Sequence, residues 1–564
     1  MCSKSCLQDL LQCLLLILML LITTPLLGSY MARIFDARSL PGEKMLYKLF
    51  HIDAAKEMDW KTYFWHLLAF NLLGLVVMYL ILVFQHLLPF NPHGLKGLSW
   101  DLALNTAVSF TTNTNWQAYG GESTVSYASQ MLGLTVQNFL SAATGIGVAL
   151  ALIRGIKRTE TPYIGNFLVD ITRATLFVLL PLAFFGAIFL VSQGVIQNFD
   201  HYLNVQLIDP ALKGKSQIIP MGPVASQEAI KLLGTNGGGF FGANSAHPFE
   251  NPTPVSNFFE CLLILLLPTA MTYTFGKLTG RQRLGWTLFG VMVFFFIVAY
   301  LAEYWAINKS HPQFEKLGVE GPYVEGQETR FGIGGSALFG VVTTSAECGA
   351  VNGMFDSYFP LAGAVPLILT GAGVIFGGVG AGLYGMLAYV VIANFIAGLM
   401  VGRVPEFIQK KLYPKDIWAS VVAALTPTLL VLLLTSVALS TQNGINSILN
   451  PGPHGITEVL YAYTSTANNN GSAFAGLNAN TIFYNLTTAF AMFGGRFVVI
   501  FAVMILAGSF AQKKLVPANP SNLREDSITF GVWLIFTILL LNVLGFFPAL
   551  SMGAILEHLI LLGG

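Results

Sequence analysis

Long apolar runs, separated by short polar stretches, dominate the pattern of this chain. About 20 apolar residues are needed to cross a bilayer as a helix. One run, 362–400, is too long for a single simple crossing and is rich in glycine, so we expect its helix to be interrupted. The pattern predicts an all-α, polytopic membrane protein with about ten transmembrane helices. The predicted spans are 10–30, 63–88, 126–152, 170–196, 256–277, 284–307, 362–400, 417–439, 480–511 and 527–550.

Four polar interruptions share one layout. In each, an apolar segment too short to cross the membrane leads into a stretch of Thr, Asn and Gly. Their sequences are "LALNTAVSFTTNTNWQAYGGE", "EAIKLLGTNGGGFFGAN", "ALFGVVTTSAECGAVNG" and "VLYAYTSTANNNGSAFAG". The polar parts begin near Thr112, Thr235, Thr344 and Thr464, a spacing of roughly 110–120 residues that marks an internal repeat. Each repeat therefore reads as span, re-entrant loop, span.

The repeats divide one membrane domain, 1–564, into six parts. An extra helix precedes the repeats and another follows them. The predicted parts are the N-terminal helix and loop 1–62, pore repeats 63–160, 161–280, 281–412 and 413–515, and the C-terminal helix 516–564.

Non-helical backbone at membrane depth is tolerated only where protein buries it or where it lines a watery cavity. Four such loops around one axis could replace the hydration shell of a cation with carbonyl oxygens. Glycine permits the backbone angles required, and Thr and Asn side chains can add ligands or brace the loop. A single Gly/Asn loop is more often a turn, but four at equivalent places favour a pore. Acids expected near the outer mouth, where they would raise the local cation concentration, are Glu122, Glu250 and Asp356.

Composition supports the membrane assignment. The chain is 54% hydrophobic and 10% charged, with a mean hydropathy of +0.65. Soluble proteins carry about 25% charged residues. The formal net charge of +1 and the absence of a long basic run exclude a typical nucleic-acid-binding protein. The five cysteines form no CxxC pair, so no transition-metal site is expected.

Basic residues predict the orientation. They fall in alternate loops, which by the positive-inside rule face the cytoplasm, and both termini are then expected outside. These basic residues are Arg33, Arg38, Lys44, Lys48, Lys56, Lys61, Arg154, Lys157, Arg158, Lys277, Arg281, Arg283, Arg403, Lys410, Lys411, Lys513 and Lys514.

Several motifs closely resemble those of the KdpA family, the potassium-transporting subunits of bacterial Kdp complexes. They are "TNTNWQAYGGE", "TNGGGFFGANSAHPFENPTP", "CGAVN" with "FGGVGAGLYGML", and "NPGPHG" with "ANNNGSAFAGL". The resemblance covers essentially the whole chain. It implies a pseudo-fourfold, channel-like subunit of the bacterial inner membrane that selects K⁺ from outside. It also implies partners: a P-type ATPase subunit (KdpB-like), which receives the ion through a lateral tunnel, and two small membrane subunits (KdpC-like and KdpF-like).

The resemblance also implies the residues of the selectivity filter. One departure is Glu347, at a position where a small or hydroxyl residue is expected; its carboxylate could add charge beside the filter or brace it from behind. The implied filter residues are Asn113, Thr114, Asn115 and Gln117; Thr235, Asn236, Gly237 and Gly238; Cys348 and Gly349; and Asn469, Asn470 and Gly471.

Two further features are expected below the filter. Arg496 lies within an apolar span, where a charge is costly; it could form an electrostatic barrier, or pair with a carboxylate for packing. The segment containing Gly377, Gly378 and Gly380 could form a gate or tunnel wall, or simply let helices pack closely.

No "DKTGT" phosphorylation motif and no GxxxxGK[ST] loop occurs in the chain, so it is not expected to hydrolyse ATP or bind a nucleotide by itself. The chief alternative is a stand-alone Trk/Ktr-like passive channel or symporter. A secondary transporter for another solute is a second alternative. Inverted repeats and a binding site at the membrane midplane are typical of such transporters, whereas the repeats predicted here share one orientation and place their polar loops toward the outside.

Overall fold

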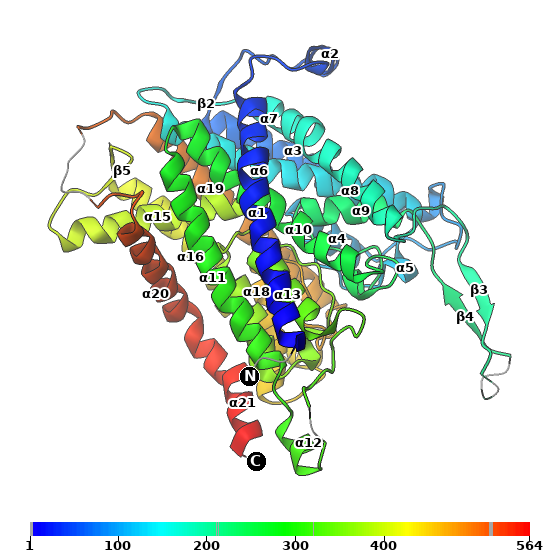
Figure 1. Cartoon of the computed structure of the whole chain (residues 1–564). Helices are drawn as coiled ribbons and strands as arrows, with labels where there is room; N and C mark the ends of the chain where they lie inside the picture. The colour runs from blue at the N-terminus through cyan, green and yellow to red at the C-terminus, as the bar shows by residue number, and fades with distance from the viewer. Residues whose placement is uncertain (1–3, 210, 212–213, 320, 518–522, 564) are drawn as a thin grey trace.

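The computed structural model describes residues 4–209, 211, 214–319, 321–517 and 523–563. Within these residues, ten helical segments are long and apolar enough to cross a membrane. This confirms the predicted all-α polytopic fold (Figure 1). The helices that form these segments are α1 (Lys4–Asp36), α3 (Trp60–Val83), α6 (Val136–Lys157), α7 (Phe167–Arg173) with α8 (Leu180–Ser192), α10 (Pro254–Thr279), α11 (Gln282–Ile307), α15 (Ala381–Met400), α16 (Pro414–Ser440), α19 (Ile482–Ala511) and α20 (Ile528–Met552).

Four shorter, almost completely buried helices lie among them. They are α4 (Trp100–Thr111), α9 (Val224–Leu233), α13 (Gly332–Ser345) and α18 (Pro453–Ala467), and we call them the pore helices. The remaining helices are α2 (Glu43–Leu49), α5 (Gly121–Thr124), α12 (Pro312–Lys316), α14 (Pro360–Ala372), α17 (Gln442–Ile445) and α21 (Ala554–Gly563).

Irregular turns and short strands complete the fold. The turns are π-helical at Ser129–Thr135 and Ala174–Leu179 and 3₁₀ at Gln85–Leu87, Asn244–Ala246 and Phe355–Ser357. The strands pair antiparallel as β1 (Met58–Asp59) with β2 (Tyr163–Gly165), β3 (Leu203–Gln206) with β4 (Ser216–Ile219), and β5 (Glu406–Phe407) with β6 (Lys410–Lys411). The β3–β4 hairpin projects from the body as an arm (Figure 1).

Local sequence explains where the spans begin and end. Thr253 precedes α10 and accepts a hydrogen bond from the Ser256 amide in a capping box, with Pro254 as the first helical residue. Gly280, with φ of +72°, ends the same helix. In the glycine-rich segment 362–400, α14 stops before Gly373 (φ +64°) and α15 starts after Gly380 (φ +77°), which confirms the expected break.

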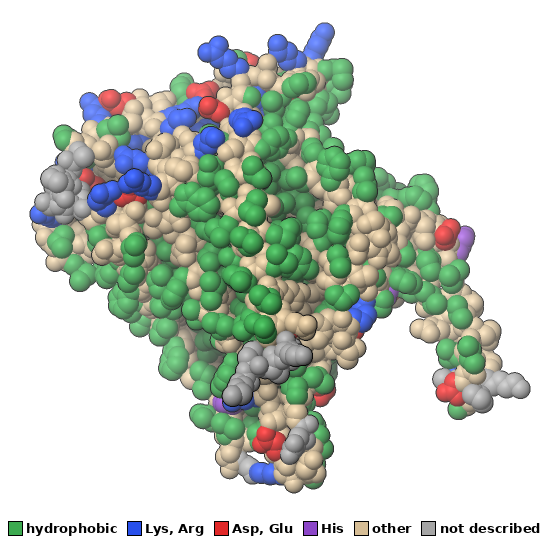
Figure 2. Space-filling model, in the orientation of Figure 1, with side chains coloured by type: hydrophobic (Ala, Val, Ile, Leu, Met, Phe, Trp, Pro, Cys, Tyr) green, Lys and Arg blue, Asp and Glu red, His purple; other side chains and the backbone are tan. Residues whose placement is uncertain are grey.

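Charge is distributed unevenly along the molecule. Lys and Arg side chains gather at the end where α2 and β2 lie, and hydrophobic side chains cover the flank below (Figure 2). The first residues of α1 and the last residues of α21 that the structure describes lie at the opposite end of the molecule (Figure 1). This arrangement agrees with the positive-inside pattern, while the orientation itself stays a prediction.

A buried ion pair joins two spans at the basic end. Arg154 binds Asp170 through two bonds of 2.5 and 2.7 Å, and the Tyr63 hydroxyl donates to the same carboxylate at 3.0 Å. Arg154→Met leaves the Asp170 carboxylate, 1% exposed, without its counter-charge. We expect a loss of about 3–5 kcal/mol in stability, measured by thermal unfolding of the purified protein in detergent.

Lys157→Met is the matched control for this prediction. The Lys157 ammonium lies 3.9 Å from Asp36 in a solvent-exposed pair, so its loss should change stability by less than about 1 kcal/mol. Equal unfolding temperatures for the two variants would show that the buried pair does not stabilise the fold.

Candidate ion-binding site

The loops after the four pore helices have the same backbone structure. In each, one amide donates to the carbonyl five residues earlier: Thr114 to Ser109 (2.9 Å), Asn236 to Lys231 (2.8 Å), Cys348 to Thr343 (2.9 Å) and Asn470 to Ser465 (2.8 Å). The preceding residue has a positive φ in every loop, at Asn113 (+64°), Thr235 (+47°), Glu347 (+48°) and Asn469 (+60°). Non-glycine residues seldom adopt this conformation, so its fourfold recurrence shows one repeated loop.

The four loops close into a ring. A Cβ built on Gly237 would lie 1.7 Å from the Cys348 carbonyl oxygen of the next repeat. Likewise, a Cβ on Gly349 would lie 2.2 Å from the Asn470 oxygen, and one on Gly471 would lie 1.7 Å from the Thr114 oxygen. Strands 2, 3 and 4 therefore each pack a glycine against a carbonyl of the neighbouring strand, where a side chain would not fit, whereas the first strand has Asn115 at this position.

Side chains join the first repeat to both of its neighbours, repeats 2 and 4. The Asn113 amide donates to the Thr235 carbonyl at 3.0 Å and accepts from Asn236 at 2.6 Å, which joins repeats 1 and 2. The Asn469 amide donates to the Thr114 hydroxyl at 2.9 Å, which joins repeats 4 and 1. The ring thus runs through all four repeats in chain order.

The ring lies in the protein interior. Each pore helix ends directly before its strand, so the partial negative charge of four helix C-termini is directed at the ring. Thr114, Asn236, Cys348 and Asn470 are at most 1% exposed. Oxygen-lined, water-poor surroundings of this kind suit a dehydrated monovalent cation.

Cavities lie on both sides of the ring. One of 280 Å³ is lined by Trp116, Gln117, Tyr119 and Glu458. The Gln117 amide bonds the backbone of Gly239 through both of its groups, at 3.0 and 3.1 Å, and so bridges repeats 1 and 2. A smaller cavity of 70 Å³ follows the ring on the other side and is lined by Gly373, Tyr384, Asn468, Asn469 and Arg496, among others.

The loop 373–380 packs directly beneath the second and third strands. The Gly377 amide donates to the Ser345 carbonyl at 2.9 Å, and the Val379 amide donates to the Thr235 hydroxyl at 2.9 Å. A Cβ on Gly378 would lie 3.4 Å from the same hydroxyl, and one on Gly380 would lie 2.1 Å from the Gly145 carbonyl. The three glycines predicted below the filter are therefore brought together there, and their gating role stays a prediction.

Arg496 is 5% exposed and faces the smaller cavity. Its guanidinium donates to the Tyr384 hydroxyl at 3.3 Å and to the Ser141 carbonyl at 3.4 Å. No carboxylate pairs with it among the described residues. The packing alternative, in which an acid neutralises Arg496, therefore finds no support in the part of the chain that the structure describes.

The acids assigned to the outer mouth need correction. Glu250 is fully buried and pairs with Lys231 at 2.9 Å, so the prediction that it lines the mouth is wrong. Glu122 is partly exposed and accepts from the Gly242 amide at 2.6 Å. Glu458, which the sequence analysis missed, lines the larger cavity instead. The sequence signal that could have identified Glu458 is an acidic residue within an otherwise apolar pore-helix segment.

Glu347 is 4% exposed, and neither carboxylate oxygen forms a hydrogen bond among the described residues. Its counterparts in the first and fourth strands, Asn113 and Asn469, bridge to the neighbouring repeat. The Asn470 amide of the next repeat lies near Glu347 and also lacks a hydrogen-bond partner within the described chain. Glu347 therefore does not form the bridge to the next repeat that Asn113 and Asn469 form.

A group of acids surrounds His454 beside the larger cavity. The imidazole bonds Asp356 and Glu557 at 2.8 Å each, and ligand atoms of Asp356, His454 and Glu458 lie within 4.8 Å of one another. These residue types can ligate a metal ion, which the sequence analysis did not anticipate. Burial alone lowers the pKa of His454, but the bonds to Asp356 and Glu557 raise it to about 10.

This histidine predicts a pH dependence for the docking of α21, which carries Glu557. Undocking α21 removes the Glu557 bond but leaves the Asp356 bond, so the pKa of His454 falls only part of the way toward its ordinary value of about 6.5. The docking stability that Glu557 supplies is therefore complete at low pH and is lost as pH rises toward 10. We expect protection of α21 amides from hydrogen exchange, corrected for intrinsic rates, to fall by up to about tenfold per pH unit in that window. His454→Gln should remove this slope; an unchanged slope would exclude His454 as its source.

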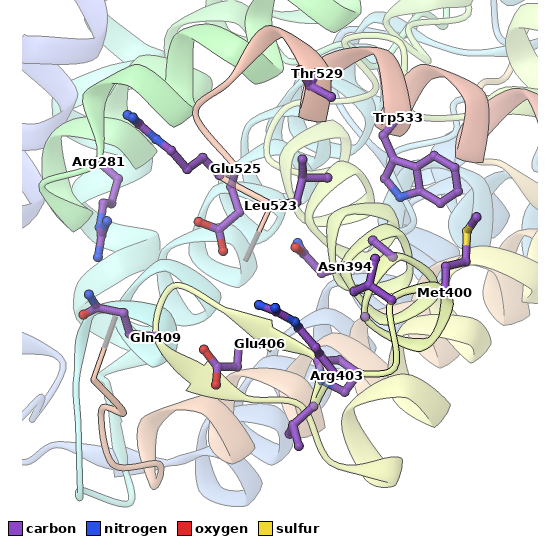
Figure 3. Close-up of a pocket in the computed structure, with 16 residues that line it drawn as sticks. Arg281, Asn394, Met400, Arg403, Glu406, Gln409, Leu523, Glu525, Thr529 and Trp533 are labelled. Atoms are coloured by element: carbon purple, nitrogen blue, oxygen red, sulfur yellow. The ribbon is translucent and has the colours of Figure 1, made fainter. Parts of the chain in front are cut away.

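A third cavity, of 590 Å³, lies at the basic end (Figure 3). Arg281, Arg403 and Arg524 line it together with Glu406, Glu525 and the Trp533 ring. Three guanidinium groups make it a poor route for a cation. This cavity is therefore a weaker candidate for cation binding than the ring.

The comparisons with known proteins agree with the motifs. The family model described as "Potassium-transporting ATPase A subunit" (KdpA) matches residues 14–559. The chain belongs to the KdpA family. It is 56% identical over 557 residues to the "Potassium-transporting ATPase potassium-binding subunit" of Hydrogenobaculum sp. (strain Y04AAS1), covering 97% of both chains. It is 50% identical over 582 residues to the protein of the same name from Geobacter sulfurreducens, covering 97% of this chain and 98% of the relative. The family resemblance is thereby confirmed.

Proposed function

We propose that this chain selects K⁺ at its ring of four loops and passes the ion to a P-type ATPase subunit for ATP-driven uptake. The observation that carries the proposal is the ring itself: three of the four repeated strands pack a glycine against a carbonyl of the next, and Asn113 joins the first strand to the second. Carbonyl oxygens arranged around an axis are the ligands that potassium filters use. The names of the relatives, which call them potassium-binding subunits, support the choice of ion.

The proposed path leaves the ring sideways. The smaller cavity lies between α15, α16 and α19, beneath the fourth strand. Arg496 and the loop 373–380 stand below the ring, where a positive charge would oppose simple downward flow of cations. An ion leaving between helices would need an adjoining subunit to receive it. The ATPase subunit and the two small accessory subunits are the proposed neighbours.

The second candidate function is a passive channel or symporter that needs no ATPase. The absence of a nucleotide or phosphorylation motif is compatible with either function, because in both cases this chain does not hydrolyse ATP. The two functions differ in whether uptake requires a partner.

Rubidium-86 uptake at micromolar K⁺ tests the proposal. The chain is expressed in bacteria lacking their own potassium systems, with and without the proposed ATPase and accessory subunits. Uptake that needs the partners and resists excess Na⁺ is expected. Uptake by this chain alone would favour the passive channel. No uptake by a complex shown to assemble would overturn the potassium proposal.

A further inference from the structure

Behind the second filter strand lies a fully buried lysine. Lys231 of α9 is 0% exposed, and its ammonium lies 2.8 Å from Glu228, 2.9 Å from Glu250 and 2.9 Å from the Asn244 side-chain oxygen. Such a charge is expensive to bury unless its partners are well placed. Here the ammonium donates hydrogen bonds to Asn244, Glu250 and the Ser245 hydroxyl (3.3 Å), and Glu228 adds a nearby carboxylate.

The same position is different in the other three repeats. Lys231 is the residue whose carbonyl accepts the strand amide, and its counterparts by that bond are Ser109, Thr343 and Ser465. Two of these hydroxyls hold their own strands directly: Ser109 donates to the Trp116 carbonyl at 2.9 Å, and Ser465 accepts from the Gly471 amide at 3.0 Å. Repeat 2 alone replaces a small hydroxyl with a long cation.

The Lys231 ammonium is linked to the second filter strand through the side chain of Asn244. Asn244 accepts from the ammonium with its oxygen and donates with its amide to the Gly237 carbonyl at 2.7 Å. The Lys231 carbonyl also accepts from the amides of Asn236 and Gly237, at 2.8 and 3.4 Å. Lys231 therefore holds two amides of the second strand through its own carbonyl, and the Gly237 carbonyl through Asn244.

The network reaches further than one loop. Glu250 accepts from the Phe241 amide at 2.7 Å as well as from the ammonium, which ties down the chain after the strand. The Asn244 oxygen also accepts from the Val351 amide at 3.4 Å, in the third loop. Loss of the ammonium would leave Glu228 and Glu250 buried without their counter-charge and would remove the bond that holds Asn244 from behind.

We propose that Lys231, acting through Asn244, is a positioning residue that sets the ion selectivity of the second filter strand. The proposal rests on the potassium function proposed above and adds to it a residue that touches no ion. A strand held by fixed hydrogen bonds keeps its carbonyls at one spacing, and discrimination between cations depends on that spacing and on the stiffness of the ligands. A looser strand should admit ions of other sizes.

The test is K⁺ uptake as a function of external K⁺ by the assembled complex, with Na⁺, Rb⁺ and NH₄⁺ as competitors. Lys231→Met should raise the half-saturating K⁺ concentration by about tenfold or more and weaken discrimination against the competitors. Lys231→Arg, which keeps the charge, should recover part of the selectivity. Asn244→Ala, which spares the ion pairs but frees the Gly237 carbonyl, should shift half-saturation in the same direction.

Arg154→Met is the matched control, because it removes a largely buried cation whose carboxylate partner, Asp170, belongs to α7 and not to a filter strand. If Lys231 and Asn244 only stabilised the fold, their variants would behave like Arg154→Met. They would give less protein and a lower maximal rate, with half-saturation and ion competition unchanged. That result in Lys231→Met and Asn244→Ala, with normal uptake by the unaltered chain, would overturn the inference and leave the proposed function intact. If the complex with Lys231→Met fails to assemble, the half-saturation and ion competition of the Asn244→Ala complex test the inference. Failure of the unaltered complex to take up K⁺ would instead overturn the proposed function.

Discussion

Gly237→Ala should reduce K⁺ uptake by the assembled complex by about a hundredfold or more. The new methyl group would lie 1.7 Å from the Cys348 carbonyl oxygen, so the second and third strands would have to separate. The φ of +90° adds strain for any residue with a side chain, at about 1–3 kcal/mol. The measurement is the initial rate of rubidium-86 uptake, normalised to the amount of complex in the membrane.

Gly280→Ala separates the two causes. Gly280 has a comparable φ of +72°, but a Cβ there meets nothing within 4 Å. This variant should lose some stability at the end of α10 and retain normal uptake per complex. If both variants transport K⁺ equally well, contact between neighbouring strands is not what makes the ring selective.

Much of the architecture could be predicted because its causes are local. Helices long enough to cross a bilayer leave a clear hydrophobic signal, and glycines at 373 and 380 mark where one of them stops. The Thr/Asn/Gly composition identified all four loops. Register was harder, since the polar starts assigned at Thr344 and Thr464 lie inside the pore helices α13 and α18. The residues of the third and fourth loops that match Asn113 and Thr235 by their positive φ are Glu347 and Asn469.

Partnerships between distant residues could not be predicted in the same way. Glu250 reads in the sequence as a loop acid, yet it is 19 residues from the lysine that neutralises it inside the protein. Its burial depends on how the loop after the strand folds back over α9. Charge counts along a loop cannot distinguish such an acid from one that faces an entrance. The orientation of the termini and the boundaries of the repeats remain predictions.

Arg496→Gln should open a passive leak. In the proposed path, the guanidinium stands below the ring and repels any cation that moves into the smaller cavity. Two unit charges about 8 Å apart in surroundings of effective dielectric constant about 20 repel by about 2 kcal/mol. Loss of that barrier corresponds to a rise of about thirtyfold in cation flux. The measurement is rubidium-86 exchange in liposomes that contain this chain without an ATPase subunit.

Arg496→Lys keeps the positive charge and should keep the leak low, although its ammonium cannot reproduce the two bonds to Tyr384 and Ser141. The comparison matters because those bonds, at 3.3 and 3.4 Å, are too long to offset the cost of a buried charge by themselves. A role as a barrier explains why the charge is present, and it predicts that Gln and Lys differ. Equal exchange rates for Gln, Lys and Arg at this position would mean that the charge does not oppose ion flow. The ring itself, or the loop 373–380, would then be the element that keeps K⁺ from passing freely.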